Sequence, residues 1–286
     1  MIVSVKSKSL AMFAKVSATA LLFVAASAAN ASLVTIPAAG LKASPGVYTA
    51  GGYYTNSLGQ NIVTTGGGNA ANIGLASGRN DDGYQALSLG FNVTFFGNTY
   101  NSLFINNNGS VSFGSGVAAF EATGPTGVDA PIISPFFGDV DTRNAGSGVV
   151  RYNLQQDQLV VTWDNVGYFS SRADLTNSFQ LVLRSDSYNP AVGEGVIGFF
   201  YKTMAWEKTG TSQLAAVGFG NGNGDGQTIA GSLKEGMNAV VQNKYIWFDA
   251  KLDTVPPITV PEPSGLALLA IGLLGAGLSA RRKTQG

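Results

Sequence analysis

The sequence predicts an all-β protein built as an antiparallel β-sandwich. Stretches with the composition of β-strands recur every 10 to 20 residues between residues 84 and 248, with turn-forming residues between them. Residues 87–95 give the clearest pattern, because large apolar side chains alternate with polar or small ones, as in a half-buried strand. A short helix is favoured only weakly, at 228–237, where two glycines interrupt the pattern. Many strands without long helices favour a sandwich over an α/β fold.

The other strand candidates follow in order along the chain. Residues 103–105 and 111–113 flank Asn108-Gly109, a pair that favours the two positive φ angles of a type I′ hairpin turn. Residues 132–137 contain Pro135, which has no amide N–H to donate, so an edge strand or a strand end is predicted there. Further strands are predicted at 149–152, 159–163, 179–183, 195–201, 215–219 and 244–248.

Residues 1–31 have the pattern of a secretory signal peptide, whose apolar part we expect to form a helix, the signal helix. Three lysines precede the apolar run 16–26, and small residues follow it up to Ala29-Asn30-Ala31. This order is typical of a peptide that signal peptidase removes, here by cleavage between Ala31 and Ser32. The mature chain is therefore expected to begin at Ser32.

The C-terminal residues predict a brief contact with the membrane. Residues 250–264 form a Pro-rich linker, and its last prolines favour an extended backbone. Residues 265–280 carry no charge and predict a transmembrane helix of about 24 Å, slightly short for a comfortable span. The basic tail 281–286 is expected to stay on the cytoplasmic side.

The linker, apolar stretch and basic end together resemble the PEP-CTERM sorting signal of Gram-negative bacteria. The resemblance implies export, transient anchorage in the inner membrane and cleavage near Pro-Glu-Pro by an exosortase. A plain tail anchor preceded by a Pro-rich linker is the alternative. The residues that carry the signal are Pro261, Glu262, Pro263, Arg281 and Arg282.

The mature chain divides into two parts by composition. Residues 32–79 are rich in Gly, Ser and Asn and poor in large apolar residues, so we expect them to be loosely ordered, with short strands near 47–48 and 61–63. Residues 80–249 hold the predicted β-sandwich domain. Of the 17 basic residues three lie in the signal peptide and three in the basic tail, which leaves 11 against 17 acidic ones. This mildly acidic balance argues against a nucleic-acid partner.

Residues 80–249 contain the strand and hairpin at 89–113, ISPFFGDVDTR at 133–143, VTWDNVGY at 161–168, NSFQLVL at 177–183 and the aromatic segments at 199–206 and 216–219. These motifs resemble the nidogen-like (NIDO) domain. They occur in the order of that family, although this chain contains no cysteine, unlike the cysteine-rich context of animal members. The resemblance implies an extracellular β-domain and a matrix location.

Catalysis has few candidate residues in this chain. The absence of histidine and cysteine excludes Ser-His-Asp and Cys-His triads and histidine metal sites. Asp139 and Asp141 are the candidates for carboxylate chemistry, as in glycosidases, with Asp164 or Glu194 as a possible distant partner. A strand-end turn with a salt bridge to Arg143 explains Asp139 and Asp141 more simply. Residues 80–83 and 221–226 hold oxygen-rich side chains and are interpreted as turns. We therefore expect no enzyme activity, cofactor or resident metal, and calcium binding stays open.

The sequence thus predicts an exported protein of the cell surface or extracellular matrix, in an exopolysaccharide-producing Gram-negative bacterium. Its expected role is structural or adhesive, for example in a biofilm. The expected partners are signal peptidase, an exosortase-type peptidase, the inner membrane transiently, and exopolysaccharide or other matrix components. The alternative is a secreted protein that binds or hydrolyses carbohydrate through Asp139, Asp141 and exposed aromatic residues.

Overall fold

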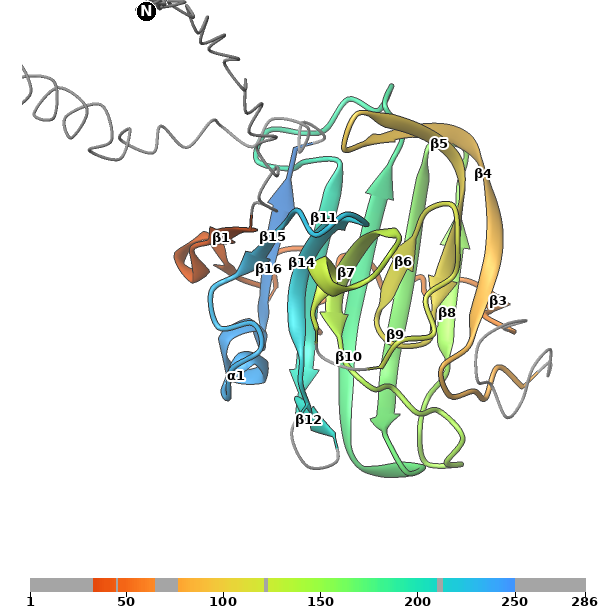
Figure 1. Cartoon of the computed structure of the whole chain (residues 1–286), viewed down its shortest axis with the longest axis vertical. Coiled ribbons are helices and arrows are strands. Elements are labelled where there is room, and N and C mark those ends of the chain that lie inside the picture. Colours follow the sequence, from red (N-terminus) through yellow and green to blue (C-terminus); the bar gives the residue numbers. More distant parts are fainter. Residues whose placement is uncertain (1–32, 45, 65–76, 121–122, 210–212, 250–286) are drawn as a thin grey trace, which may run out of the picture. The chain divides into compact units, whose positions relative to one another are not determined.

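The computed structural model describes residues 33–44, 46–64, 77–120, 123–209 and 213–249 (Figure 1). Two seven-stranded sheets make up the fold. The first sheet has the order β1 (Leu33–Ile36), β15 (Gly226–Ile229), β14 (Ala216–Asn221), β7 (Pro131–Phe137), β6 (Ser110–Ser112), β5 (Asn98–Asn106) and β4 (Tyr84–Phe95). The second has the order β2 (Lys42–Ala43), β16 (Lys244–Phe248), β11 (Ile197–Met204), β10 (Arg172–Arg184), β9 (Gln158–Tyr168), β8 (Val150–Leu154) and β3 (Asn61–Ile62).

Short elements complete the described part of the chain. β12 (Lys208–Thr209) and β13 (Gln213–Leu214) form a small separate hairpin, and the helical segments are η1 (Ala38–Gly40), η2 (Pro125–Gly127) and α1 (Met237–Val241). The neighbouring strands of both large sheets run antiparallel, except that β1 pairs with β15 in parallel. The predicted all-β class is confirmed, and the first sheet is mixed because of this one parallel pair, whereas the second sheet is antiparallel throughout the described residues.

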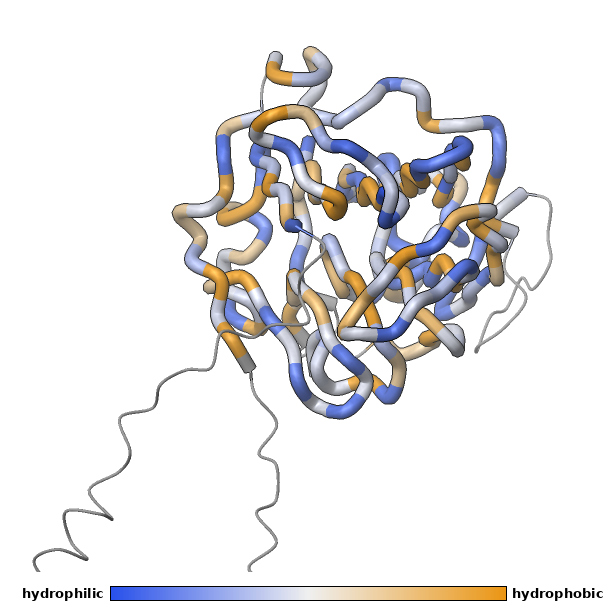
Figure 2. Tube along the Cα trace, turned by 90° about the horizontal axis from the view of Figure 1, so that it is seen from above, coloured by the Kyte–Doolittle hydropathy of each residue, from blue (hydrophilic) through white to orange (hydrophobic). Residues whose placement is uncertain are grey.

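The two large sheets pack face to face around one aromatic core. Phe199 of β11 stacks on Phe219 of β14, with ring centroids 5.3 Å apart, and Phe136 of β7 lies 5.7 Å from Phe179 of β10. The phenol of Tyr201 donates a hydrogen bond of 2.7 Å to the Pro135 carbonyl across the two layers. Hydrophobic and hydrophilic residues alternate over short distances along the trace, as strands with two different faces require (Figure 2).

Strand β7 lies inside its sheet, so the predicted edge position of residues 132–137 is wrong. It pairs with β6 on one side and with β14 on the other. Pro135 is tolerated because the register with β14 shifts between the pairs Ser134–Gly218 and Phe137–Ala216, which places the proline at a bulge.

The segment 32–79 contributes more order than its composition predicts. Strands β1, β2 and β3 come from it and occupy three of the four sheet edges. Tyr53 is buried, and its hydroxyl donates a hydrogen bond of 2.7 Å to Asp164. Edge strands gain much of their stability from main-chain pairing, so they need few apolar side chains. The two-residue strands β2 and β3 occupy both edges of the second sheet, and such short edge strands hinder pairing with other chains.

The hairpin of β5 and β6 forms as predicted, but its turn is of another kind. A three-residue loop, 107–109, joins the paired residues Asn106 and Ser110. Gly109 has φ 77°, whereas Asn108 keeps a negative φ, so the predicted type I′ turn is wrong. Two consecutive positive φ angles occur instead at Phe96 (45°) and Gly97 (76°), the two residues that join β4 to β5.

The terminal predictions concern other parts of the chain. The signal helix in 1–31, most of the linker 250–264, the transmembrane helix 265–280 and the tail 281–286 lie outside the described residues. Within the described residues no helix has the length and apolar character needed to cross a membrane.

Candidate functional site

Three loops meet where strands of the first sheet begin or end. They are residues 80–83 before β4, residues 107–109 between β5 and β6, and residues 138–143 after β7. Main-chain hydrogen bonds join them: the Asn107 N–H donates to the Gly83 carbonyl (2.8 Å), and the Thr142 N–H donates to the Asn80 carbonyl (2.9 Å). The Asn107 side-chain amide donates to the Val140 carbonyl. The three loops therefore form one connected unit.

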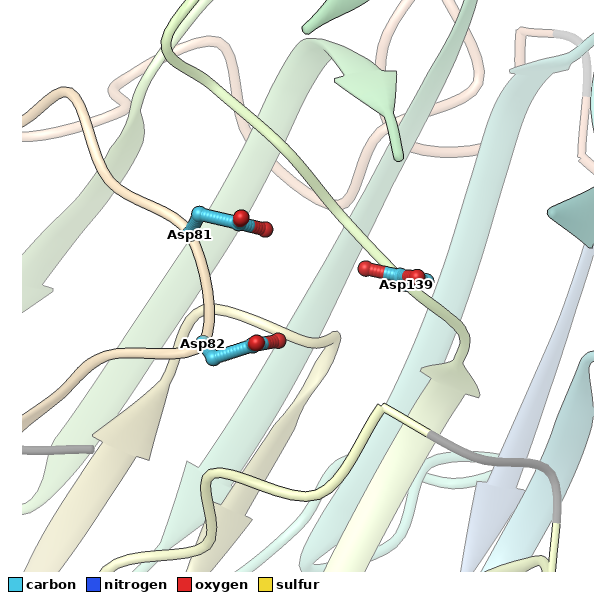
Figure 3. A group of neighbouring side chains, drawn as sticks. All are labelled: Asp81, Asp82 and Asp139. Carbon is cyan, nitrogen blue, oxygen red and sulfur yellow. The ribbon is translucent and has the colours of Figure 1, made fainter. Parts of the chain in front are cut away.

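Three buried carboxyl groups converge at this junction. Asp81 and Asp82 come from the loop before β4, and Asp139 comes from the loop after β7. The three residues are 8%, 5% and 3% exposed, and one carboxylate oxygen from each lies within 4.8 Å of the others. Figure 3 shows the carboxyl groups of Asp81 and Asp82 extending from one segment toward Asp139 on the segment facing it. We call these three residues the acidic cluster.

Asp141 takes a different role from Asp139, although the sequence offers them as a pair. Its carboxylate accepts two hydrogen bonds from the Arg143 guanidinium, of 2.9 and 2.5 Å, and one from the Ser171 main-chain N–H at 2.7 Å. The same guanidinium lies 2.7 Å from an oxygen of Asp81. The predicted strand-end salt bridge of Asp141 and Arg143 is confirmed, and it uses the carboxylate of Asp141 fully.

Burial changes the acidity of the cluster. It raises the pKa of Asp139 to about 8, with the carboxylates of Asp82, Asp81 and Asp141 adding to the effect. Burial, reinforced by Asp141 and Asp82, raises the pKa of Asp81 to about 7, while Arg143 opposes the shift. The pKa of Asp82 is raised by burial against the hydrogen bond from Asn108. Negative charge on this cluster is therefore costly near neutral pH.

Two asparagines beside the cluster have unused polar atoms. The Asn108 amide nitrogen donates 2.8 Å to Asp82 and 3.2 Å to the Ala119 carbonyl, but its buried oxygen has no hydrogen-bond donor. Neither the oxygen nor the nitrogen of the buried Asn80 amide has a partner, and one buried oxygen of Asp81 has none. Buried polar atoms without partners are uncommon in folded proteins, so this group needs a physical explanation.

An open groove of about 590 Å³ lies beside the β9–β10 hairpin. Phe169 and Leu175 line it and are 45% and 44% exposed. Glu207 is the one acidic residue among the described residues that line this groove, and its carboxylate accepts the main-chain N–H groups of Gly236 and Asn238. Asp139 and Asp141, the two candidate carboxylates, do not line it, so this groove does not join them with the exposed ring of Phe169.

Sequence reasoning found the parts of the acidic cluster without their combination. It noted residues 80–83 as an oxygen-rich turn and Asp139 as a partner of Asp141. Asp81 and Asp139 are far apart in the chain, so local spacing carries no signal for their contact. The sequence places Asn108 in the Asn108-Gly109 hairpin turn and gives no sign that its side chain contacts Asp82. The sorting residues Pro261, Glu262, Pro263, Arg281 and Arg282 and the cleavage pair Ala31 and Ser32 lie outside the described residues.

Comparison with known proteins gives two family matches. Residues 52–249 match the family described as NIDO related, and residues 259–283 match the PEP-CTERM protein-sorting motif. The sorting motif implies export to the cell surface and processing by exosortase-type machinery. The predicted nidogen-like domain and sorting signal are thus confirmed, and the family match begins upstream of the predicted boundary at residue 80.

Curated relatives share part of this chain. Nidogen of Drosophila melanogaster is 25% identical over 62% of this chain and 16% of its own length. Alpha-tectorin is 27% identical in Gallus gallus and 29% identical in Mus musculus, in each case over 50% of this chain and 8% of the relative. The chain therefore spans a small fraction of each of these proteins, and no solved structure matches it. Because the family match covers well over half of its residues, the chain belongs to the NIDO-related family.

Proposed function

We propose that the protein is a non-enzymatic structural or adhesive component of the cell surface or extracellular matrix of a Gram-negative bacterium. The observation that carries this proposal is the order of the two matches, since the sorting motif at 259–283 follows the NIDO-related domain at 52–249 almost directly. One extracellular β-domain is thereby attached to one surface-sorting signal.

The proposed route has three steps. Signal peptidase cleaves between Ala31 and Ser32, and the apolar stretch 265–280 then holds the chain in the inner membrane. An exosortase-type peptidase cuts near Pro261-Glu262-Pro263 and releases the domain to the surface, where exopolysaccharide or another matrix component is the proposed partner. The short apolar stretch supports a transient anchor, because a permanent span usually needs about 20 residues.

The geometry supports a binding role over a hydrolytic one. A glycosidase needs two carboxylates flanking the substrate, about 5–9.5 Å apart. The groove offers only Glu207, which is occupied by main-chain donors, while Asp141 is bound by Arg143. Asp139 is buried in the acidic cluster and does not line the groove. We therefore propose that the domain binds its matrix partner and does not hydrolyse it.

The sorting step is tested with a variant in which Pro261, Glu262 and Pro263 are replaced by Ala. The apolar stretch and basic end stay intact, so insertion should persist while release to the medium falls and the uncleaved form accumulates in the inner membrane. Triple replacement of Asp253, Thr254 and Val255 by Ala is the matched control and should be released normally. Fractionation blots measure the distribution, and mass spectrometry locates both ends of the released chain, with Ser32 expected first. Equal release of both variants would contradict the sorting step.

The adhesive role needs a separate measurement. Cells that lack the protein should retain less of their own purified exopolysaccharide on the surface, and expression of the wild-type chain should restore retention. The variant with Ala at positions 261, 262 and 263 should fail to restore retention, because the uncleaved protein does not leave the inner membrane. Unchanged retention in cells that lack the protein would refute the adhesive role and leave the sorting step standing.

A further inference from the structure

The acidic cluster has the donor set of a site for a hard cation. Asp81, Asp82 and Asp139 present one oxygen each within 4.8 Å of the others. Two oxygens bound to one ion cannot be farther apart than twice the metal–oxygen distance, which is about 4.6–5.2 Å for calcium and about 4.0–4.2 Å for magnesium. The whole of the observed spread is thus within the reach of calcium.

Free oxygen atoms beside the carboxylates are an independent observation. Asn108 is 1% exposed, and its side-chain nitrogen donates a hydrogen bond to Asp82, which leaves the oxygen of the same amide group beside the cluster without a donor. One oxygen of Asp81 is engaged by Arg143, and the other is buried without a partner. Among the described residues none donates a hydrogen bond to the Asp139 carboxyl group. Amide and carboxylate oxygens are the ligands that calcium takes in proteins.

The charges of the described residues around the cluster do not balance. Arg143 is the guanidinium that forms salt bridges here, and it is shared by Asp81 and Asp141. Arg79 lies nearby, but its guanidinium donates to the main-chain carbonyls of Thr142, Asn144, Ala145 and Ser147. Burying several carboxylates without an equal number of positive charges is unfavourable, and a divalent cation offsets this repulsion directly.

We propose that Asp81, Asp82, Asp139 and the side-chain oxygen of Asn108 bind one calcium ion. The ligands come from all three loops, so the ion joins the loop before β4, the β5–β6 hairpin and the loop after β7. Magnesium is a poorer match, because it keeps several waters and demands a tighter octahedron, whereas this site supplies protein oxygens from rigid loops. Sites in extracellular modules bind calcium with dissociation constants of about 10⁻⁴–10⁻³ M, and we expect an affinity in this range.

The first test compares purified full-length protein with the variants Asp139→Asn and Asp157→Asn. Asp157 is an exposed acid in the β8–β9 turn, at the other end of β9 from the cluster, so it is the matched control. Calcium at about 100 times its dissociation constant should raise the unfolding midpoint of the wild type and of Asp157→Asn by about 5–10 °C relative to EGTA. The midpoint of Asp139→Asn should not respond to calcium.

The unfolding midpoint of Asp139→Asn in EGTA, compared with that of the wild type, shows whether Asp139 is a calcium ligand or a residue that the fold itself requires. Asp139→Asn keeps the size of the side chain and removes one of the repelling charges, so in EGTA this variant should unfold no earlier than the wild type. A midpoint of the wild type that ignores calcium would overturn the proposal, as would an equal response in Asp139→Asn. Equal stabilisation by magnesium at the same concentration would overturn the assignment to calcium.

A second measurement needs only the wild-type chain, in case Asp139→Asn does not fold. Terbium(III) replaces calcium and emits when nearby aromatic residues are excited. Trp163 is a suitable donor, because its indole N–H bonds the Asn107 carbonyl at 3.0 Å, in the same loop as Asn108. We expect emission that saturates at one terbium per chain and is displaced by calcium. No saturable emission, or emission that calcium does not displace, would refute the site.

Discussion

Replacing Gly109 by Ala should destabilise the domain far more than its single methyl group suggests. Gly109 lies in the β5–β6 loop with φ 77°, and a Cβ at this position would lie 1.8 Å from the carbonyl oxygen of Phe136 and 3.3 Å from the ring of Phe179. Both phenylalanines are fully buried. The extra carbon therefore fits only if β7 moves away from the hairpin.

The loss in the free energy of unfolding caused by Gly109→Ala has several parts. The left-handed conformation costs a residue with a Cβ about 1–2 kcal/mol, and the less flexible unfolded chain returns about 0.4–1 kcal/mol. Overpacking against a buried strand adds about 1–3 kcal/mol. Displacing β7 also weakens the bonds that the Gly109 carbonyl accepts from the Phe136 N–H (3.3 Å) and the Ser134 hydroxyl (3.1 Å). The conformational, unfolded-state and overpacking terms sum to roughly 1–5 kcal/mol before the weakened hydrogen bonds are counted, and the upper end is a large share of the stability of a typical domain.

Gly97→Ala supplies the matched control. Gly97 has φ 76°, nearly the same as Gly109, but no atom lies within 4 Å of the position that its Cβ would take. This variant therefore carries the conformational cost without the clash, about 1 kcal/mol. Urea unfolding followed by tryptophan fluorescence should separate the two variants by about 1–3 kcal/mol, the overpacking term, together with the loss from the weakened hydrogen bonds. Equal losses would show that the loop relaxes around the methyl group and that the contact with Phe136 does not restrain it.

Two further predictions concern the acids. In EGTA the free energy of unfolding should fall as the pH rises from about 4 to about 8, because the raised pKa values of Asp81 (about 7) and Asp139 (about 8) let the folded chain hold protons that the unfolded chain has released. Urea titrations at pH 5 and pH 8 measure this change, which should be smaller in Asp139→Asn, and stability that rises with pH would contradict the burial. We also expect no turnover of glycosides, esters or peptides, and a robust rate lost in a folded Asp141→Asn variant would refute the non-enzymatic assignment.

Local patterns in the sequence predict the strands of this fold well. The alternation over residues 87–95 corresponds to β4, and the apolar run 179–183 lies inside β10. The short strand expected near 61–63 corresponds to β3, whereas the one expected near 47–48 does not form. The edge strands β1 and β2 have no local signal, because their partners are remote: Leu33 pairs with Gly226, and Lys42 pairs with Tyr245. Such pairing depends on main-chain hydrogen bonds, which leave little trace in composition.

Turn type and the acidic cluster were harder to predict for the same reason. Asn-Gly favours a type I′ turn locally, but tertiary contacts decide here, since the Gly109 carbonyl bonds residues of β7. The contact between Asp81 and Asp139 arises because β7 ends beside the loop that precedes β4. The bridge between Asp81 and Asp141 fixes that closeness, and no spacing within either segment encodes it.

The loop 107–109 supports both the packing of β7 and the geometry of the acidic cluster. Asn108 holds Asp82 through its amide, and the next residue, Gly109, presses its backbone against Phe136. The Gly138 N–H also donates to the Asn108 carbonyl (3.4 Å), so Asp139 follows directly on a residue tied to the same loop. A displacement that relieves the clash in Gly109→Ala must therefore move Asn108 relative to Asp139. Weaker calcium binding should accompany the loss of stability in that variant, whereas Gly97→Ala, in a separate turn, should bind calcium as the wild type does.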